Sequence, residues 1–262
     1  MKQEIINKNC IQGLSELEDK SVDLVITDPP YAVLGTDSGY RQKWDTFNSF
    51  EEYMGIIRKV FSEINRVTKD DSHIYIFWSQ KYLKEGLDVF NPNRVLIWHH
   101  PNLTKTTNKM FLWTYDPILY IKKGKPTFKA QFLKKENVDV FNYAKPQSNW
   151  KYELNRFHPT SKPLKLIYNF VKISSKENDL VLDPFVGGGT TAVACKQLNR
   201  NFIGYEINPE YCEIANKRLE QKTVSGFNPP NEESLISVKR ESADSPNSPH
   251  DSSAIKEEAN FS

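Results

Sequence analysis

The chain has 262 residues, of which 38% are hydrophobic and 12% aromatic, and a net charge of only +2, which together indicate one large domain with a buried core. It contains no apolar run of membrane-spanning length and no signal-peptide pattern, so we expect neither a membrane protein nor a secreted one. Its three cysteines fit no metal-binding spacing, which argues against a zinc site and favours a reducing compartment.

The first 31 residues predict a strand, a short helix and a second strand. The apolar run 22–27 leads directly into Asp28-Pro29-Pro30-Tyr31, so this tetrapeptide should form a loop where a buried strand ends. Residues 32–50 are polar and contain glycine, which is typical of a loop. Residues 51–68 carry apolar side chains at helical spacing and predict a helix.

Three further strands are predicted over residues 73–78, 95–98 and 118–121. The last of them lies inside segment 99–135, which holds eight lysines and one acid, Asp116. Such a segment suits a solvated face, and it also suits binding to the phosphate backbone of a nucleic acid. The region that follows, up to residue 157, is polar, basic and interspersed with aromatic side chains.

Strands and helices alternate in the next part of the chain. Helices are predicted over 162–175, 188–199 and 209–222, and strands over 179–183 and 201–207. This alternation favours an α/β fold with a doubly wound, mostly parallel sheet. From Thr223 onward the chain is rich in Ser, Pro and Glu and carries a net charge of −4, so we expect residues 223–262 to form a disordered tail.

The segment around Asp183 has the features of a nucleotide-like cofactor site. Three glycines, at 187, 188 and 189, follow the strand that ends at Asp183, and a helix begins after them. Glu206 ends the next strand, nineteen residues after Gly187, where an acid can bind both ribose hydroxyls. The glycines lack the G-x-G-x-x-G spacing that seats a pyrophosphate, so S-adenosyl-L-methionine fits better than a dinucleotide.

These motifs, with His-Pro-Thr-Ser-Lys-Pro at 158–163 and Ile203-Gly204-Tyr205-Glu206, closely resemble the permuted β-group of amino-specific DNA methyltransferases. In that family the catalytic loop precedes the cofactor loop, and the target-recognition segment lies between them. The resemblance covers about residues 4–222. It implies a seven-stranded Rossmann-like methyltransferase domain over 1–222, with a small target-recognition insertion at approximately 122–157.

The resemblance also implies roles for individual side chains. Asp183 would meet the amino group of S-adenosyl-L-methionine and Glu206 its ribose, while Asn9, where the family usually has Asp, would lie near the adenine. The remaining implied cofactor contacts are Phe185, Gly187, Gly189 and Thr190 on the methionine and ribose side, and Thr160, Ser161 and Lys162 at the carboxylate end. The family usually has Gln at the position of Ser161.

The loop Asp28-Pro29-Pro30-Tyr31 would carry the catalysis. An exocyclic amino nitrogen is a poor nucleophile because its lone pair delocalises into the base. The Asp28 carboxylate and the Pro29 carbonyl can accept its two hydrogens, and the two prolines hold both acceptors rigidly. Tyr31 can stack on a base that has been flipped out of the helix.

The identity of the target is open at this stage. Family members with Asp at the first position of the loop mostly modify adenine N6, and those with Ser mostly modify cytosine N4, so Asp28 favours adenine. Cytosine-C5 chemistry is disfavoured because no cysteine follows a proline, and we assign no catalytic role to His99 or His100. An RNA or protein-glutamine methyltransferase is disfavoured by the order of the motifs, and a non-catalytic DNA-binding protein by the intact catalytic and cofactor motifs.

The resemblance implies double-stranded DNA as the partner, and a homodimer or a cognate restriction endonuclease is compatible with it. We expect a cytoplasmic, nucleoid-associated protein in a prokaryotic host. Two apolar-Lys-x-Glu tetrapeptides and two Ser-Pro pairs in the tail leave a eukaryotic host, and a nuclear location, open.

Overall fold

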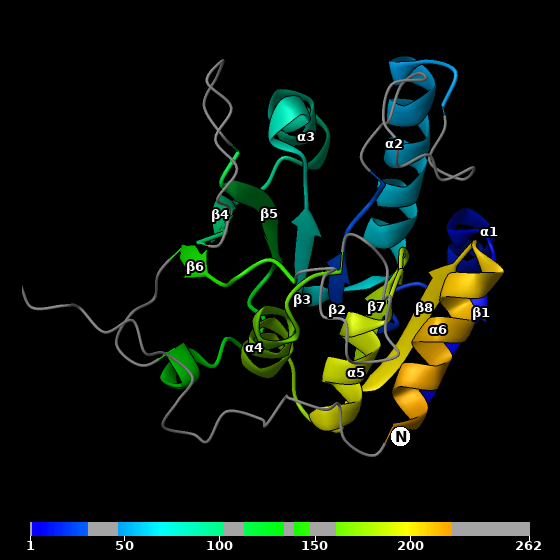
Figure 1. Ribbon diagram of the computed structural model, residues 1–262, viewed down its shortest axis with the longest axis vertical. Coiled ribbons are helices and arrows are strands. Elements are labelled where there is room, and N and C mark those ends of the chain that lie inside the picture. The colour runs from blue at the N-terminus through cyan, green and yellow to red at the C-terminus, as the bar shows by residue number, and fades with distance from the viewer. Residues whose placement is uncertain (1, 31–46, 102–112, 134–138, 147–160, 222–262) are drawn as a thin grey trace, which may run out of the picture.

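The computed structural model describes residues 2–30, 47–101, 113–133, 139–146 and 161–221 (Figure 1). The strands are β1 Gln3–Asn7, β2 Val22–Thr27, β3 Thr68–Phe77, β4 Arg94–His99, β5 Tyr115–Lys123, β6 Val140–Asn142, β7 Leu180–Asp183 and β8 Asn201–Glu206. The helices are α1 Cys10–Ser15, α2 Phe50–Val67, α3 Leu83–Phe90, α4 Leu164–Ser174, α5 Thr190–Gln197 and α6 Pro209–Glu220, with 3-10 helices η1 Gln80–Tyr82 and η2 Ala130–Leu133. None of the described helices is long and apolar enough to cross a membrane.

The strands form one sheet in the order β1-β8-β7-β2-β3-β5-β4-β6, which is one strand more than the seven expected. Neighbouring strands are parallel except for the two pairs that contain β5. The carboxyl ends of β2, β3, β4, β7 and β8 therefore lie at one edge of the sheet, which we call the carboxyl edge. Open α/β sheets bind their ligands outside this edge.

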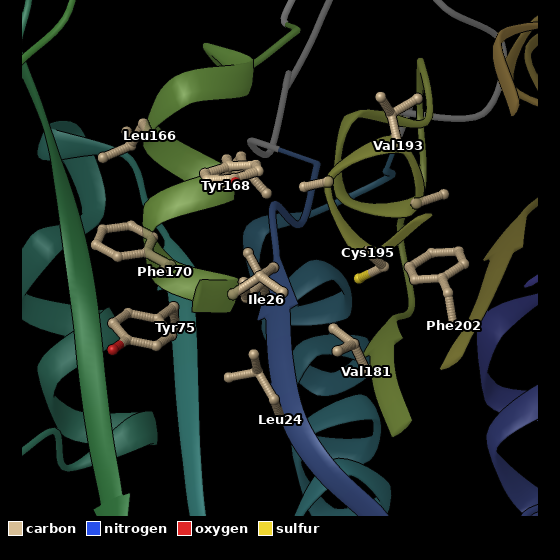
Figure 2. Close-up of a cluster of buried hydrophobic side chains, with 14 of the residues drawn as sticks. Leu24, Ile26, Tyr75, Leu166, Tyr168, Phe170, Val181, Val193, Cys195 and Phe202 are labelled. Carbon is tan, nitrogen blue, oxygen red and sulfur yellow. The ribbon is translucent and has the colours of Figure 1, made fainter. Parts of the chain in front are cut away.

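Helices cover both faces of the sheet, which confirms the doubly wound fold (Figure 1). Leu24 and Ile26 of β2 pack in one core with α4, α5 and α6, whereas Val25 packs in a second core with α1, α2 and α3. This is the alternation of side chains expected along a strand that is buried on both faces. Figure 2 shows the first core, in which Phe170 of α4 and Cys195 of α5 lie with the side chains of β2.

Local sequence explains where α2 begins. The hydroxyl of Ser49 caps the helix by accepting a hydrogen bond from the backbone of Glu52 at 3.1 Å. The Glu52 carboxylate in turn accepts the backbone N–H of Asn48 at 2.9 Å, in an arrangement similar to a capping box. The buried stripe that includes Tyr53, Ile57 and Ile64 then holds α2 against the sheet.

The predicted strands and helices within the described residues are confirmed to within a few residues, with one larger difference at β3. That strand begins at Thr68 rather than at residue 73, because Thr68 pairs with Val22 across an irregular step in the β2–β3 register. The hydrophobic pattern did not predict this extension because residues 69–71 are charged. Helix α3 and strand β6 were not expected, since each is short; β6 falls within the predicted recognition region and pairs with β4.

The lysines of β5 lie away from the carboxyl edge. Lys122 and Lys123 pair with His73 and Ser72 in the middle of β3, and His73 in turn pairs with Leu24 near the start of β2, so both lysines stand away from the carboxyl edge. The Lys123 ammonium donates to the backbone oxygens of Asn65 and Thr68. Of the lysine-rich segment 99–135, the described Lys122 and Lys123 therefore do not lie beside the Asp28 loop.

Candidate active site

Three carboxylates meet at the carboxyl edge. Asp28 follows β2, Asp183 ends β7 and Glu206 ends β8, and these strands are adjacent in the sheet. The pairing of Val25 with Leu182 sets Asp28 and Asp183 near each other, although 155 positions separate them in the chain. Each of these carboxylates was predicted to lie at the end of a strand, and the structure confirms that the three strand ends are adjacent.

Asp183 is held in a buried position at the head of the glycine loop. One of its oxygens accepts the backbone N–H of Phe185 at 3.1 Å and the other accepts the Thr191 hydroxyl at 2.8 Å. Burial raises the pKa of Asp183 to about 7, and the negative charge of nearby Asp28 adds to the rise, while the two hydrogen bonds oppose it. Asp183 is therefore an anion whose charge is easily lost near neutral pH.

Glu206 ties the glycine loop to the end of β8. Its two carboxylate oxygens accept the backbone N–H groups of Gly187 at 2.9 Å and Asn208 at 2.8 Å. Gly187 has a φ of +51°, in the left-handed region that favours glycine. The carboxylate is thus fixed in direction at the position where the sequence predicted a ribose contact.

Gly189 has a structural reason to be glycine. Its φ is +79°, and a Cβ atom there would lie 2.8 Å from the Cβ of Ala215 in α6. The close approach lets α5 begin beside α6, and Thr190, the first residue of α5, is buried. The predicted cofactor contact by Gly189 stays a prediction, beside this packing role.

Arg218 is a site residue that sequence reasoning missed as a functional group. Its guanidinium donates to the Gly188 carbonyl and approaches the Thr190 hydroxyl at 3.4 Å. Burial lowers the pKa of Arg218 to about 10. An arginine on an otherwise apolar, sheet-facing side of the last helix is the signal that would have marked it.

The catalytic loop leaves β2 through a buried Pro29 and a half-buried Pro30. The carboxylate of Asp28 forms an ion pair with the ammonium of Lys162, which reaches it from the segment before α4. The structure thus gives Lys162 a partner that the sequence did not indicate. Tyr31 and Thr160 lie outside the described residues, and Ser161 is half-buried beside Lys162.

Asn9 lies at the same edge, beside Glu206. Its side-chain oxygen accepts the backbone N–H of Ile11 at 2.9 Å and so caps α1. The neighbouring Lys8 donates its backbone N–H to the carbonyl of Glu206 at 3.1 Å. Asn9 therefore has a capping role of its own, and its contact with the adenine stays a prediction.

A second polar group flanks the loop on the side of β4 and β5. His100 is buried, with its Nε2 atom 3.3 Å from the Asp116 carboxylate and its ring against Trp98, the centroids 4.3 Å apart. Burial lowers the pKa of His100, Asp116 opposes this, and the positive charges of Lys145 and Lys162 add to the lowering. This environment favours the neutral form of the ring.

Comparison with known proteins shows similarity to DNA methyltransferases. A family model described as DNA methylase, of the N6/N4 type, matches residues 22–217. The chain is 35% identical over 248 residues to the type II methyltransferase M.HpaI of Haemophilus parainfluenzae, covering 87% of this chain and 77% of that protein. It is 31% identical to the type II methyltransferase M.HinfI of Haemophilus influenzae, covering 89% of this chain and 72% of the relative.

Solved structures show the same architecture. The M1.HpyAVI–SAM complex matches with a TM-score of 0.63 and 25% identity, covering 84% of this chain and all of that one. The cytosine-N4-specific PvuII DNA methyltransferase matches with a TM-score of 0.68 and 18% identity, covering 86% of this chain and 89% of that one, and so supports the fold alone. On the family match and the identity to M.HpaI, this chain belongs to the N6/N4 amino-methylating DNA methylases.

Proposed function

We propose that this chain methylates the exocyclic amino group of a flipped base in double-stranded DNA, and that the base is adenine, modified at N6. The observation that carries the proposal is the placement of the Asp28 carboxylate at the end of β2, directly beside the β7 strand that ends at Asp183. The first position of the loop is Asp rather than Ser, which favours adenine over cytosine. Cytosine N4 is the alternative, because the same acceptors would serve its amino group.

The residues at the edge fit S-adenosyl-L-methionine. When bound, this cofactor supplies an electrophilic methyl group on a sulfonium sulfur. Its cationic amino group suits the Asp183 carboxylate, and its ribose hydroxyls suit the fixed carboxylate of Glu206. Phe185 and the glycine loop would line the methionine, and Ser161 with Thr160 would meet its carboxylate end.

Asp28 and Pro29 would act on the base rather than on the cofactor. The Asp28 carboxylate and the Pro29 carbonyl would accept hydrogen bonds from the two amino hydrogens. This favours a pyramidal nitrogen whose lone pair is directed at the methyl group. Pro29 is buried and its ring fixes the backbone, so both acceptors are set before the base arrives. Tyr31 would stack on the flipped base.

The direct test is methyl transfer from labelled S-adenosyl-L-methionine to DNA, RNA and protein in parallel. We expect label in DNA alone, and sequencing of modified bases in DNA from cells expressing the chain should place N6-methyladenine at one short motif. N4-methylcytosine at that motif would support the alternative base. Label in RNA or protein, with none in DNA, would contradict the proposal.

The catalytic loop gives a sharper prediction. Asp28→Ala should abolish methyl transfer, since the amino group loses an acceptor that orients it, while cofactor affinity measured by calorimetry stays close to that of the wild type. Turnover that survives the substitution would show that Asp28 does not orient the amino group.

The family relatives also suggest a biological setting. M.HpaI and M.HinfI are type II methyltransferases, and we propose that this chain likewise protects a recognition site against a cognate restriction endonuclease. A homodimer would extend the DNA contact surface beyond the small target-recognition segment of one chain. Resistance of DNA from expressing cells to cleavage at the methylated motif, and sedimentation of the purified protein, test the two statements separately.

A further inference from the structure

The ion pair between Lys162 and Asp28 lies at the centre of the edge and has no part in the proposed methyl transfer as described so far. The two residues are 134 positions apart in the chain. The side chain of Lys162 is 8% exposed and that of Asp28 is 21% exposed, so the pair is largely removed from water. Buried charges occur where a partner compensates them, and loss of one partner leaves the other charge unpaired.

Two aromatic rings hold the ammonium in place. The Nζ atom of Lys162 lies 5.2 Å from the ring centroid of Phe77 and 6.0 Å from that of Trp98. Both rings are buried at the carboxyl ends of β3 and β4. A cation over an aromatic face gains electrostatic attraction, so these two buried rings help to hold the ammonium in place.

The backbone of Lys162 is equally constrained. Pro163 follows it as the N-cap residue of α4, and the body of α4 packs into the core beside β2 and β3. The lysine therefore approaches Asp28 from a fixed direction. An anchored cation of this kind orients a carboxylate more firmly than a solvent-exposed lysine would.

We infer that Lys162 is a positioning residue for the target amino group: it fixes the Asp28 carboxylate as a hydrogen-bond acceptor, and it is not a ligand of the cofactor. This inference rests on the proposed function, in which Asp28 receives the amino group. It replaces the cofactor contact that the family resemblance implied for Lys162, because the ammonium already has a carboxylate partner on the catalytic loop. Lys162 also offsets the negative charge that Asp28 presents toward Asp183.

The test compares Lys162→Met with a matched control, Lys172→Met. Lys172 lies in α4, with its Nζ atom 4.4 Å from the ring centroid of Phe132, so the control also removes a lysine from an aromatic face. With Lys162→Met we expect kcat to fall roughly 100-fold, the loss that a misplacement of about 1 Å can cause. The KM for DNA should change by less than about threefold, and Lys162→Arg, which keeps the charge, should recover part of the loss.

Cofactor binding separates the two roles of Lys162. Calorimetry without DNA, at pH 8.5 where Asp183 is ionised, should give the same S-adenosyl-L-methionine affinity for Lys162→Met, Lys172→Met and the wild type. If Lys162→Met folds but binds the cofactor more weakly, Lys162 is a ligand of the cofactor and the inference is wrong. Turnover by Lys162→Met equal to that of Lys172→Met would also overturn the inference.

A readout without catalysis comes from thermal unfolding of Asp28→Asn, Lys162→Met and the double variant. If the pair holds in solution, the double variant should be more stable than the sum of the single losses predicts. If the stability losses of the two single variants simply add in the double variant, Lys162 and Asp28 do not interact in solution. Failure of the proposed function looks different, since the wild-type protein would then transfer no methyl group to DNA while the stability coupling persisted.

Discussion

Burial raises the pKa of Asp183 to about 7, so near neutral pH this carboxyl group exchanges its proton in the folded protein. Its ordinary value is 3.8, and the folded state therefore holds this proton more tightly than the unfolded chain does. The contribution of Asp183 to stability is consequently full below pH 3.8 and is lost as the pH rises through 7. A bound cationic ligand favours the ionised carboxylate, so it would lower the pKa of Asp183 again.

This charge state predicts a pH dependence of cofactor binding. Below pH 7 the affinity for S-adenosyl-L-methionine should fall by up to about tenfold per pH unit, since Asp183 must release its proton to meet the cationic amino group. Calorimetry in two buffers of different ionisation enthalpy should detect proton release on binding near pH 6.5. Asp183→Asn should bind more weakly and without proton release; the same release in that variant would assign the proton to another group.

At the level of elements, the glycine loop is held by its neighbours rather than by its own sequence. Glu206 at the end of β8 accepts the N–H of Gly187, and Arg218 of α6 donates to the carbonyl of Gly188. Gly189 is the N-cap residue of α5, and it packs in a left-handed conformation against α6. Three consecutive glycines are thereby given a defined path, although glycine alone would leave them free.

A pair of glycine substitutions tests this packing. Gly189→Ala should destabilise the protein by roughly 1–3 kcal/mol, because the new Cβ meets Ala215 at 2.8 Å and φ is +79°. Gly55→Ala is the matched control, since a Cβ there meets nothing within 4 Å and α2 gains a better helix former. Thermal unfolding should show opposite signs for the two variants. A neutral Gly189→Ala would mean that the loop and α6 are not in close contact in solution.

Sequence patterns predicted the elements that carry strong periodicity and the residues that end them. Asp28, Asp183 and Glu206 could be placed together because each directly follows an apolar strand, and parallel strands share a carboxyl edge. The contact between Lys162 and Asp28 could not be predicted, because it depends on how α4 packs over β2 and β3. The place of Lys122 along the sheet could not be predicted either, since charge clustering in sequence gives no direction along a strand.

For the whole molecule, charge divides the chain into a body of +6 and a tail of −4. Helix α6 ends at Glu220 and packs against β1 and β8, which completes one covering layer of the sheet. The tail that follows has a composition that buries little apolar surface. The fold should therefore not depend on it.

We predict that a chain ending at Lys222 keeps its melting temperature and its methylation of short duplexes. Removing the acidic tail should also tighten non-specific DNA binding at low salt, because a segment of opposite charge no longer competes for the basic body. Calorimetry and a salt titration of DNA binding measure both effects. Aggregation or lost activity in the shortened protein would place the tail within the fold.

The position of β1 has a consequence for how the protein is made. In the described sheet β1 pairs with β8 alone, in a register that sets Gln3 against Phe202. A chain emerging from the ribosome thus exposes β1 without its partner strand until β8 has been synthesised. Sheet contacts of such long range form slowly. Ribosome-bound chains that stop before β8 should therefore leave β1 open to proteolysis and bind no cofactor, so the activity can appear only after β8 has been synthesised.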